Sequence, residues 1–416
     1  MYRRALEVMP GGVNSPVRAI RAIGRDPIFV ERGEGAELLD VDGNRYLDYV
    51  CSWGPLILGH AEPSVVEAVR EAAARGTSFG APTEAETELA SEVAERFASV
   101  DMLRMVNSGT EAGMSAVRLA RAATGRDAVL KFAGAYHGHS DGLLAEAGSG
   151  MATHGIPASP GITEAQAADT VVVPWNDPGA VTAALAERQV AAILAEPVPA
   201  NMGVVLPEKG FLEFLRKQAD DHGALLVLDE VISGFRVARG GAQELYGVDA
   251  DLTVMGKVIG GGLPAAAYGG RRELMERVAP AGDVYQAGTL SGNPLAVAAG
   301  LATLRKLDAA AYGRLGMLTG RLAAGLREAA GDRPVQVVSA CGLLTVFFSA
   351  EPVDDFAGAS ACDLDAHARF CRALLERGIY APPSQFEAWF VSLAHDDASI
   401  DRTIEIATEA FADVLG

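Results

Sequence analysis

One lysine stands in surroundings that suit covalent chemistry. Lys257 follows an apolar run, 252–255, and Gly256, and it precedes Val258, Ile259 and three consecutive glycines. Burial disfavours the charged ammonium form, and no neighbour in the sequence neutralises it. A desolvated lysine loses its proton readily and can condense with a carbonyl group. Lys257 is therefore a candidate nucleophile, although most lysines in glycine-rich loops are simply solvated.

Carboxylates end two apolar runs of the kind that form buried strands. The run 224–228 ends in Asp229 and Glu230, and the run 191–195 ends in Glu196. Ligands of open parallel sheets bind at the carboxyl ends of the strands. A carboxylate there can be a helix cap or an ion-pair partner. Alternatively, it can lie beside a pyridine nitrogen and keep it protonated, so that the ring accepts electrons from a carbanion.

A serine-glycine-threonine turn precedes the helical stretch 114–123. Ser108, Gly109 and Thr110 have the composition of a helix cap. The same arrangement presents free backbone N–H groups and the positive end of the helix dipole to an anion, and a phosphate would fit. The spacing differs from that of a nucleotide-binding P-loop.

An aromatic residue and two histidines follow the apolar run 128–132. His137, His139 and Asp141 have a spacing that suggests a metal site, but the chain has only seven histidines and no second cluster to complete the ligand set. We expect no metal. Stacking of Tyr136 on a flat cofactor ring is the better interpretation.

Helical stretches and short apolar runs alternate from residue 60 to residue 310. Helices over 64–74 and 84–97 and strands such as 170–173 and 252–255 predict an α/β protein with a mostly parallel sheet. A hairpin is expected in the N-terminal segment, 1–59, around Asp42-Gly43-Asn44. Residues 311–416 suggest a smaller α+β domain after the large domain, 60–310.

Composition narrows the function classes. A net charge of −19 over 416 residues argues against nucleic acid, which requires a concentrated basic face. The four cysteines show no C-x-x-C spacing and are expected as reduced thiols. No apolar stretch is long enough to span a membrane, and no signal peptide is evident. We therefore expect a cytoplasmic protein that acts on a small-molecule substrate.

Lys257, Asp229, the Ser108–Thr110 turn and Tyr136 together resemble a fold-type-I pyridoxal-phosphate enzyme of the class III aminotransferase group. Similar segments run nearly end to end, and within the group they are most like the aminomutases, which move an amino group within one substrate. Examples are PGGVNSPVRA (10–19), SWGPLILGH (52–60), VNSGTEA (106–112), LDEVISGFR (228–236), GKVIGGGLP (256–264) and YQAGTLSGNP (285–294).

The resemblance implies roles at a cofactor site for pyridoxal 5'-phosphate, with the pyridoxamine form in the cycle. Lys257 would bind the cofactor covalently and move protons, and Asp229 would hold the pyridine nitrogen. Tyr136 would stack on the ring, with Asn201 close to it. The phosphate would be bound by Ser108, Gly109 and Thr110.

The resemblance also implies a homodimer and a substrate site. Thr289 would reach the phosphate of the neighbouring subunit. Arg18 would bind the substrate carboxylate, with Ser15 and Trp53 nearby. The segment around Ser149 would be a mobile lid.

Glu387 favours the aminomutases, because related aminotransferases are expected to carry an arginine near this point for an α-carboxylate. Two alternatives remain. The first is an aminotransferase or amino-group isomerase for a different carboxylate-bearing substrate, and the second is a cofactor-binding regulator without activity. Residues that depart from the family pattern are Ala133, Pro199, Ala200, Gly113, Ser233 and Trp389, and all of them except Gly113 could alter the substrate.

Overall fold

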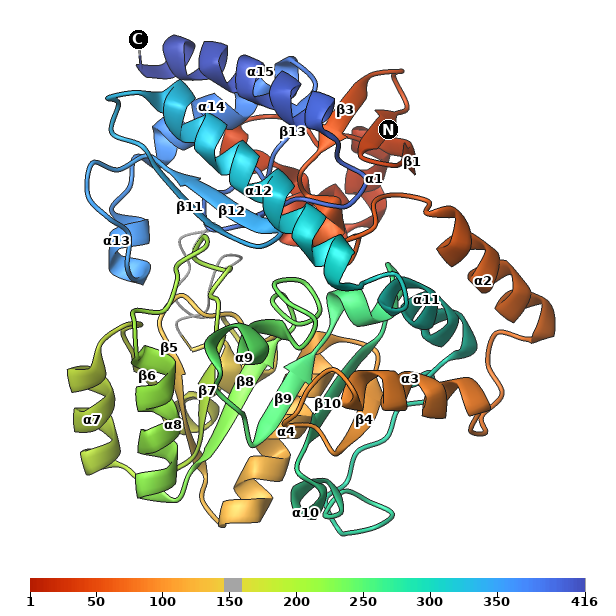
Figure 1. The fold of residues 1–416 in the computed structure, drawn as a ribbon. Coiled ribbons are helices and arrows are strands. Elements are labelled where there is room, and N and C mark those ends of the chain that lie inside the picture. Colours follow the sequence, from red (N-terminus) through yellow and green to blue (C-terminus); the bar gives the residue numbers. More distant parts are fainter. Residues whose placement is uncertain (146–158, 416) are drawn as a thin grey trace.

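The structure is a computed structural model that describes residues 1–145 and 159–415 (Figure 1). A seven-stranded sheet in the order β4-β10-β9-β8-β7-β5-β6 forms the centre of its larger part. Neighbouring strands from β9 to β6 run parallel, so the predicted mostly parallel sheet is confirmed. The strands are β4 (Met102–Val106), β5 (Ala128–Phe132), β6 (Thr170–Val173), β7 (Val190–Ala195), β8 (Leu225–Glu230), β9 (Leu252–Met255) and β10 (Ala266–Gly270).

Strand β10 runs antiparallel to both of its neighbours, β9 and β4. Its sequence, Ala-Ala-Tyr-Gly-Gly, has no β-branched residue and therefore gives a weak strand signal. All of its residues are buried, and a Cβ atom at Gly270 would lie 2.2 Å from the carbonyl oxygen of Asp251. Close packing requires small residues here. Because small residues are not typical of strands, the sequence analysis did not predict this one.

Helices pack against this sheet and surround it (Figure 1). Helix α4 contacts β7, β9 and β10, α8 contacts β7 and β8, and α7 contacts β6. The helices of this part are α2 (Pro63–Arg75), α3 (Glu84–Ala94), α4 (Gly109–Thr124), α6 (Glu164–Ala168), α7 (Pro178–Glu187), α8 (Phe211–His222), α9 (Gly241–Tyr246), α10 (Arg272–Met275) and α11 (Pro294–Leu304). The short 3-10 helices here are η4 (Cys51–Trp53), η5 (Asp141–Leu143) and η6 (Lys257–Gly260).

The C-terminal part contains a three-stranded antiparallel sheet, β11-β12-β14, beside three long helices (Figure 1). The expected smaller domain of mixed helix and sheet is confirmed. Its strands are β11 (Gln336–Ala340), β12 (Leu343–Phe347) and β14 (Trp389–Phe390), and its helices are α12 (Ala309–Ala330), α13 (Phe356–Ser360), α14 (Leu364–Glu376) and α15 (Asp397–Leu415).

A four-stranded sheet, β1-β2-β3-β13, joins the two ends of the chain. The predicted hairpin is present as β2 (Glu37–Asp40) and β3 (Arg45–Asp48), with β1 (Val30–Glu34) on its outer side. Strand β13 (Ile379–Tyr380) then pairs in parallel with β3. The N-terminal segment, which also holds α1 (Tyr2–Val8) and the 3-10 helices η1 (Pro10–Gly12), η2 (Pro16–Ala19) and η3 (Arg21–Ile23), therefore packs with the C-terminal part. The division of the chain at residues 59 and 310 stays a prediction.

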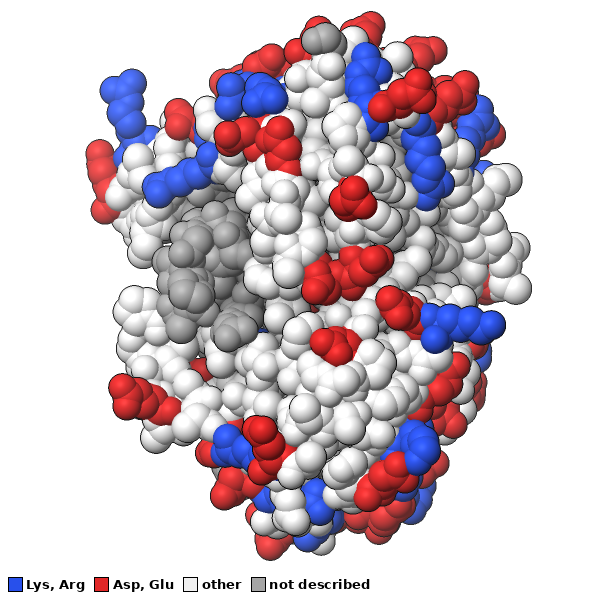
Figure 2. All heavy atoms as spheres, turned by 90° about the vertical axis from the view of Figure 1, so that its left-hand side faces the viewer, with Lys and Arg blue, Asp and Glu red and all other residues white. Residues whose placement is uncertain are grey.

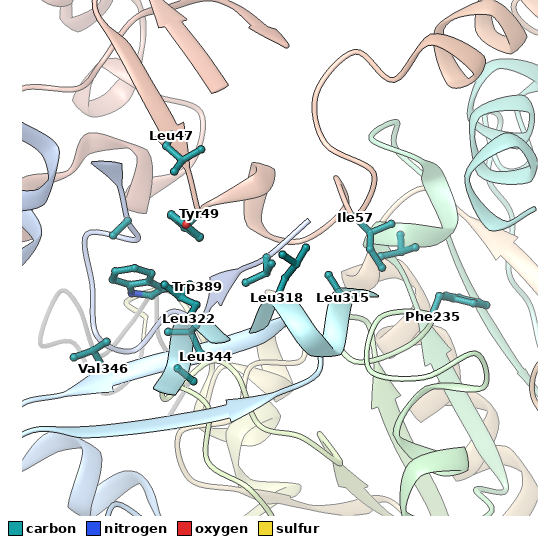
Figure 3. Packing of buried hydrophobic residues seen from close by; sticks show 14 of the residues in the cluster. Leu47, Tyr49, Ile57, Phe235, Leu315, Leu318, Leu322, Leu344, Val346 and Trp389 are labelled. Atoms are coloured by element: carbon teal, nitrogen blue, oxygen red, sulfur yellow. The ribbon is translucent and has the colours of Figure 1, made fainter. Parts of the chain in front are cut away.

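One hydrophobic cluster connects these parts (Figure 3). Leu47 and Tyr49 from the N-terminal segment share it with Leu318 of α12 and Trp389 of β14. The aromatic rings of Tyr49 and Trp389 lie with centroids 5.5 Å apart. Phe235, which follows β8, belongs to the same cluster. Burial of this apolar surface holds the N-terminal segment and the C-terminal part together beside the central sheet.

The surface of the described part carries charges of both signs. On the face shown in Figure 2, acidic and basic side chains are interspersed over the upper and lower thirds, and no basic patch is visible. Among the helices of the described residues, none is long and apolar enough to cross a membrane. The four cysteines are free, and three of them are buried.

Candidate active site

A cavity of 420 Å³ lies at the carboxyl ends of the central strands. Asp229 is near the end of β8, Glu196 follows β7 directly, and Lys257 follows β9 after one glycine. This is where an open parallel sheet binds its ligands. The lining residues are Pro55, Asn107, Ser108, Gly109, Thr110, Tyr136, His137, Gly138, Glu196, Asn201, Asp229, Val231, Ile232, Lys257, Gly262, Leu263, Pro264 and Ala265.

Lys257 is held in a backbone conformation that most residues avoid. Its φ is +49°, in the left-handed region, and the two residues that follow, Val258 and Ile259, are fully buried. Burial lowers the pKa of the lysine amine, and the negative charges of Glu387 and Asp229 oppose that shift. The amine therefore loses its proton more readily than a surface lysine, as a nucleophile must.

Asp229 forms a hydrogen-bonded pair with a histidine. Its Oδ2 lies 2.8 Å from His137 Nδ1, and its Oδ1 accepts a hydrogen bond of 3.0 Å from the backbone N–H of Val231. Burial lowers the pKa of His137 even though the carboxylate opposes this, so the neutral ring donates from Nδ1. Its Nε2 is buried and has no hydrogen-bond partner within the described ranges. Asp229 thus lines the cavity with its side chain held by His137 and Val231.

Glu196 connects two segments of the cavity wall. Its carboxylate accepts hydrogen bonds from the backbone N–H of Tyr136 at 2.9 Å, from the backbone N–H of Ala200 at 3.1 Å and from Asn201 Nδ2 at 2.9 Å. Burial, with the nearby charge of Asp229, raises the pKa of Glu196 to about 7. The segments that carry Tyr136 and Asn201 are thus fixed by one carboxyl group.

The turn before α4 is shaped to bind an anion. Ser108 is the N-cap of α4, and its hydroxyl accepts a hydrogen bond from the backbone N–H of Glu111. A Cβ atom at Gly109 would lie 3.1 Å from the Val231 side chain, and one at Gly138 would lie 2.6 Å from Thr110 Cα. Glycine at both positions leaves the helix N-terminus open to the cavity, where its N–H groups and dipole favour a phosphate.

Tyr136 lines the same cavity and is 36% exposed. Its pKa is raised, mainly by burial, and a side-chain hydrogen bond with Thr110 opposes the shift. The His139 ring contacts the same threonine, with Nδ1 3.1 Å from Thr110 Oγ1. A neutral phenol ring at this place can stack on a flat ligand.

Those residues expected to bind substrate that the structure describes do not line this cavity, and only one of them is placed near it. Glu387 is partly buried, and its charge acts on both Lys257 and Tyr136, which places it near the cavity. Arg18, in η2, is exposed and does not line the cavity, and neither do Ser15 and Trp53.

Two further expected residues lie elsewhere. Ser149 is outside the described residues. Thr289 is exposed and lines a separate cavity of 360 Å³, together with the segment 78–83. Within one copy of this chain, Thr289 therefore does not reach the turn before α4.

The six departures from the family pattern do not line the cavity as far as the structure describes it. Trp389 is buried in the core against Tyr49. A Cβ atom at residue 113 would lie 3.0 Å from the carbonyl oxygen of His137, which explains glycine in the middle of α4. Ser233 donates a hydrogen bond to the buried carboxylate of Glu230. The structure therefore gives Trp389, Gly113 and Ser233 structural roles outside the cavity lining.

The site fits pyridoxal phosphate on its own geometry. Asp229 offers a buried carboxylate for a ring nitrogen, the turn before α4 offers N–H groups for a phosphate, and Lys257 offers an amine for an aldehyde. A side chain at Gly109 would crowd Val231, and one at Gly138 would crowd Thr110 at the N-terminus of α4. Within the described ranges, no group of three or more His, Cys, Asp or Glu is placed to hold a metal ion.

The family model for aminotransferase class III matches residues 20–411. This chain belongs to the class III aminotransferase family. The chain is 59% identical to a glutamate-1-semialdehyde 2,1-aminomutase of Roseiflexus castenholzii, covering 100% of this chain and 96% of that protein. It is 58% identical to the protein of the same name from Desulforudis audaxviator, over 99% and 96% of the two chains.

Solved structures of this pyridoxal-phosphate-dependent family share the fold. An omega-transaminase from Sphaerobacter thermophilus superimposes with a TM-score of 0.93 at 34% identity, covering 100% of this chain and 97% of that one. A lysine-to-alanine variant of a glutamate-1-semialdehyde-aminomutase from Pseudomonas aeruginosa, in complex with PMP, gives a TM-score of 0.88 at 28% identity, over 99% and 93% of the chains. The predicted fold-type-I architecture is thereby confirmed.

Sequence reasoning missed two partners at the site. The sequence analysis considered His137 only as a possible metal ligand, but in the structure it pairs with Asp229. Glu196 was noted only as a strand end, yet it holds Tyr136 and Asn201. The only signal for either was position, because both follow strands whose carboxyl ends meet at this edge of the sheet.

Proposed function

We propose that the cavity around Lys257 is the active site of a glutamate-1-semialdehyde 2,1-aminomutase. This isomerase converts glutamate-1-semialdehyde to 5-aminolevulinate, a tetrapyrrole precursor, by moving an amino group between neighbouring carbons of one substrate. The observation that carries the proposal is the shared cavity of Lys257 and the buried Asp229. An identity of 59% to a glutamate-1-semialdehyde 2,1-aminomutase, over 96% of that protein, supports it.

Pyridoxal phosphate supplies an electron-accepting ring when bound, and its pyridoxamine form supplies the amino group that enters the substrate. Asp229 holds a proton on the ring nitrogen, and His137 keeps the carboxylate in place. Ser108, Gly109 and Thr110 bind the phosphate through the N-terminus of α4.

Lys257 carries the proton steps of the amino shift. The shift runs through a diamino acid, and each half of it requires a proton to leave one carbon and reach another. The lowered pKa of the lysine amine favours its uncharged form, and only that form can accept the proton. Tyr136 would stack on the ring and Asn201 would lie close to it, and Glu196 fixes the segments that carry both residues.

Substrate binding falls to the N-terminal and C-terminal segments. Arg18 binds the substrate carboxylate, with Ser15 and Trp53 beside it. Glu387 repels an α-carboxylate at the position where it stands and directs the substrate to Arg18. The affinity of an Arg18 variant for the semialdehyde tests this assignment.

The enzyme works as a homodimer in the cytoplasm. Thr289 lies in a cavity apart from the turn before α4 in its own chain. A second copy that brings Thr289 to the phosphate completes the anion site. Sedimentation of the purified chain tests this, because a monomer with full activity would contradict it.

The alternative is an ordinary class III aminotransferase for a different carboxylate-bearing substrate. The similarity to an omega-transaminase at 34% identity keeps this alternative open. Incubation with glutamate-1-semialdehyde and no amino donor separates the two. Formation of 5-aminolevulinate supports the aminomutase, whereas a strict requirement for an external donor supports the aminotransferase.

A further inference from the structure

A fully buried arginine lies behind the cavity and takes no part in the chemistry described so far. Arg236 is 0% exposed, and within the described ranges its guanidinium donates to backbone carbonyls and forms no ion pair with Asp or Glu. Burial lowers its pKa to about 10. A buried cation without a carboxylate is costly, so its retention calls for a reason.

The guanidinium ties together three segments that are distant in sequence. It donates hydrogen bonds to the carbonyl oxygens of Gly54, of Gly342 at 3.3 Å and of Val391 at 3.0 Å. It also lies over the ring of Phe390, 5.1 Å from the centroid. One side chain thus connects the N-terminal segment and one end of the β12–β14 pairing, where Gly342 and Val391 face each other, to the segment after β8.

The segment held at Gly54 is strained. Cys51, Ser52 and Trp53 have φ values of +44°, +56° and +68°, and Gly54 follows with +117°. Three consecutive non-glycine residues in the left-handed region are costly and persist only where surrounding contacts hold them. Asp48 accepts a hydrogen bond of 2.8 Å from the N–H of Val50, just before the turn, and Arg236 holds its far end.

This turn packs directly on the lysine. A Cβ atom at Gly54 would lie 2.9 Å from Lys257 Cδ and 2.9 Å from Phe390 Cε1. The lysine stem and the phenyl ring therefore meet at Gly54, and Arg236 contacts both the Gly54 carbonyl and that ring.

We propose that Arg236 is a positioning residue for Lys257, which it serves by holding the Cys51–Gly54 turn and the Phe390 ring against the lysine side chain. The inference rests on the proposed function, in which Lys257 bonds to the cofactor. It adds a residue that touches neither cofactor nor substrate.

The charge of Arg236 supports the same role. The charged groups that act on Lys257 are Glu387, Asp229 and Glu196, which raise the pKa of its amine, and Arg236, which lowers it. Removal of the guanidinium charge therefore raises the pKa of the amine, whereas Arg236→Lys keeps a positive charge at this position while it changes the hydrogen bonds. The two contributions can be measured separately.

The test compares Arg236→Met, Arg236→Lys and a control, Arg126→Met. Arg126 also donates to two backbone carbonyls, those of Val190 and His222, but it lies away from the cavity. Competitive acetylation of the full chain without cofactor, followed by peptide mass spectrometry over a pH series, reports the pKa of the Lys257 amine. Turnover of glutamate-1-semialdehyde by the cofactor-loaded protein gives kcat and KM.

We expect Arg236→Met to shift the acetylation midpoint of Lys257 upward and to lower kcat at least about tenfold, with a smaller change in KM. Arg236→Lys should keep the midpoint and still lose kcat, because an ammonium cannot hold three carbonyls in a planar fork. Arg126→Met should change neither. If Arg236→Met does not fold, the kcat of Arg236→Lys alone tests the proposal.

Wild-type kcat in Arg236→Lys, or an unchanged midpoint and kcat in folded Arg236→Met, overturns the inference. Failure of the proposed function looks different. In that case borohydride reduction of the wild-type protein with pyridoxal phosphate labels no Lys257 peptide, whereas the acetylation midpoints remain measurable.

Discussion

Asp229 and Asp251 lie at opposite ends of the central sheet, and each is 6% exposed. Asp251, at the amino end of β9, is paired with Arg216 at 2.8 Å and Arg271 at 2.9 Å, and it accepts a hydrogen bond from the backbone N–H of Leu226. Asp229, at the carboxyl end of β8, pairs only with the neutral His137 among the described residues. One carboxylate is paired with two arginines, and the other has no arginine or lysine within ion-pair distance in the described part of the chain.

The contrast extends to the neighbours of each carboxylate. Around Asp229 stand a lysine with a lowered pKa, a glutamic acid with a raised pKa and a histidine with a lowered pKa. Around Asp251 stand exposed or half-exposed cations in ordinary ion pairs. Equal burial therefore says little about function, whereas a buried charge without a compensating partner indicates a ligand site.

The largest effect is expected from Lys257→Ala. The variant should bind pyridoxal phosphate through the phosphate and ring contacts but lose turnover, because the bond-forming and proton-moving amine is gone. Absorbance of the bound cofactor and 5-aminolevulinate formation measure the two properties. Lys217→Ala, at an exposed lysine paired with Asp221, is the control and should be fully active. Turnover by Lys257→Ala would contradict the assignment.

The comparison itself is tested by Asp229→Asn against Asp251→Asn. Asp229→Asn should lower kcat by about 10²- to 10³-fold with little loss of stability, since it removes the charge that holds a proton on the ring nitrogen. Asp251→Asn should lower the free energy of unfolding by roughly 1–3 kcal/mol and leave kcat nearly unchanged. Urea unfolding and steady-state kinetics measure both. If both variants lost kcat equally, the two carboxylates would not differ in function, and the comparison would be wrong.

Arg18→Ala tests whether Arg18 binds the substrate carboxylate. We expect KM for glutamate-1-semialdehyde to rise by about tenfold to a hundredfold, because a charge-assisted contact with the carboxylate is lost. Cofactor affinity should not change, since Arg18 does not line the cavity. Kinetics together with cofactor titration separate these effects. An unchanged KM would show that another residue binds the carboxylate.

The smallest effect is expected from Glu196→Gln, and it depends on pH. The pKa of Glu196 is raised from 4.5 to about 7 in the folded protein. Between these values the folded protein holds a proton that the unfolded chain releases, so this group lowers stability as pH rises. The glutamine variant lacks that loss, and its stability relative to wild type should therefore increase from pH 4.5 to 7 and then level off. Urea unfolding at about pH 5 and about pH 8 measures the difference, and a pH-independent difference would contradict it.

Much of the large part of the fold could be read from the sequence. Apolar runs such as 170–173 and 252–255 became β6 and β9, because a strand buried on both faces must be apolar throughout. Strand β10 was not predicted, because its residues are small enough for close packing and give only a weak strand signal. The pairing of β13 with β3 was not predicted either, because it joins residues more than 300 positions apart in the sequence.

The sequence by itself determined which chemical groups are present and which strand ends carry them, because local apolar patterns place Asp229, Glu196 and Lys257 after successive strands. Only the tertiary structure decided what each group faces. His137 meets Asp229, Glu196 holds Tyr136, and Arg236 reaches Gly54 through long-range packing. Burial and the partners that come with it set the charge of a side chain, and neither is a property of its neighbours along the chain.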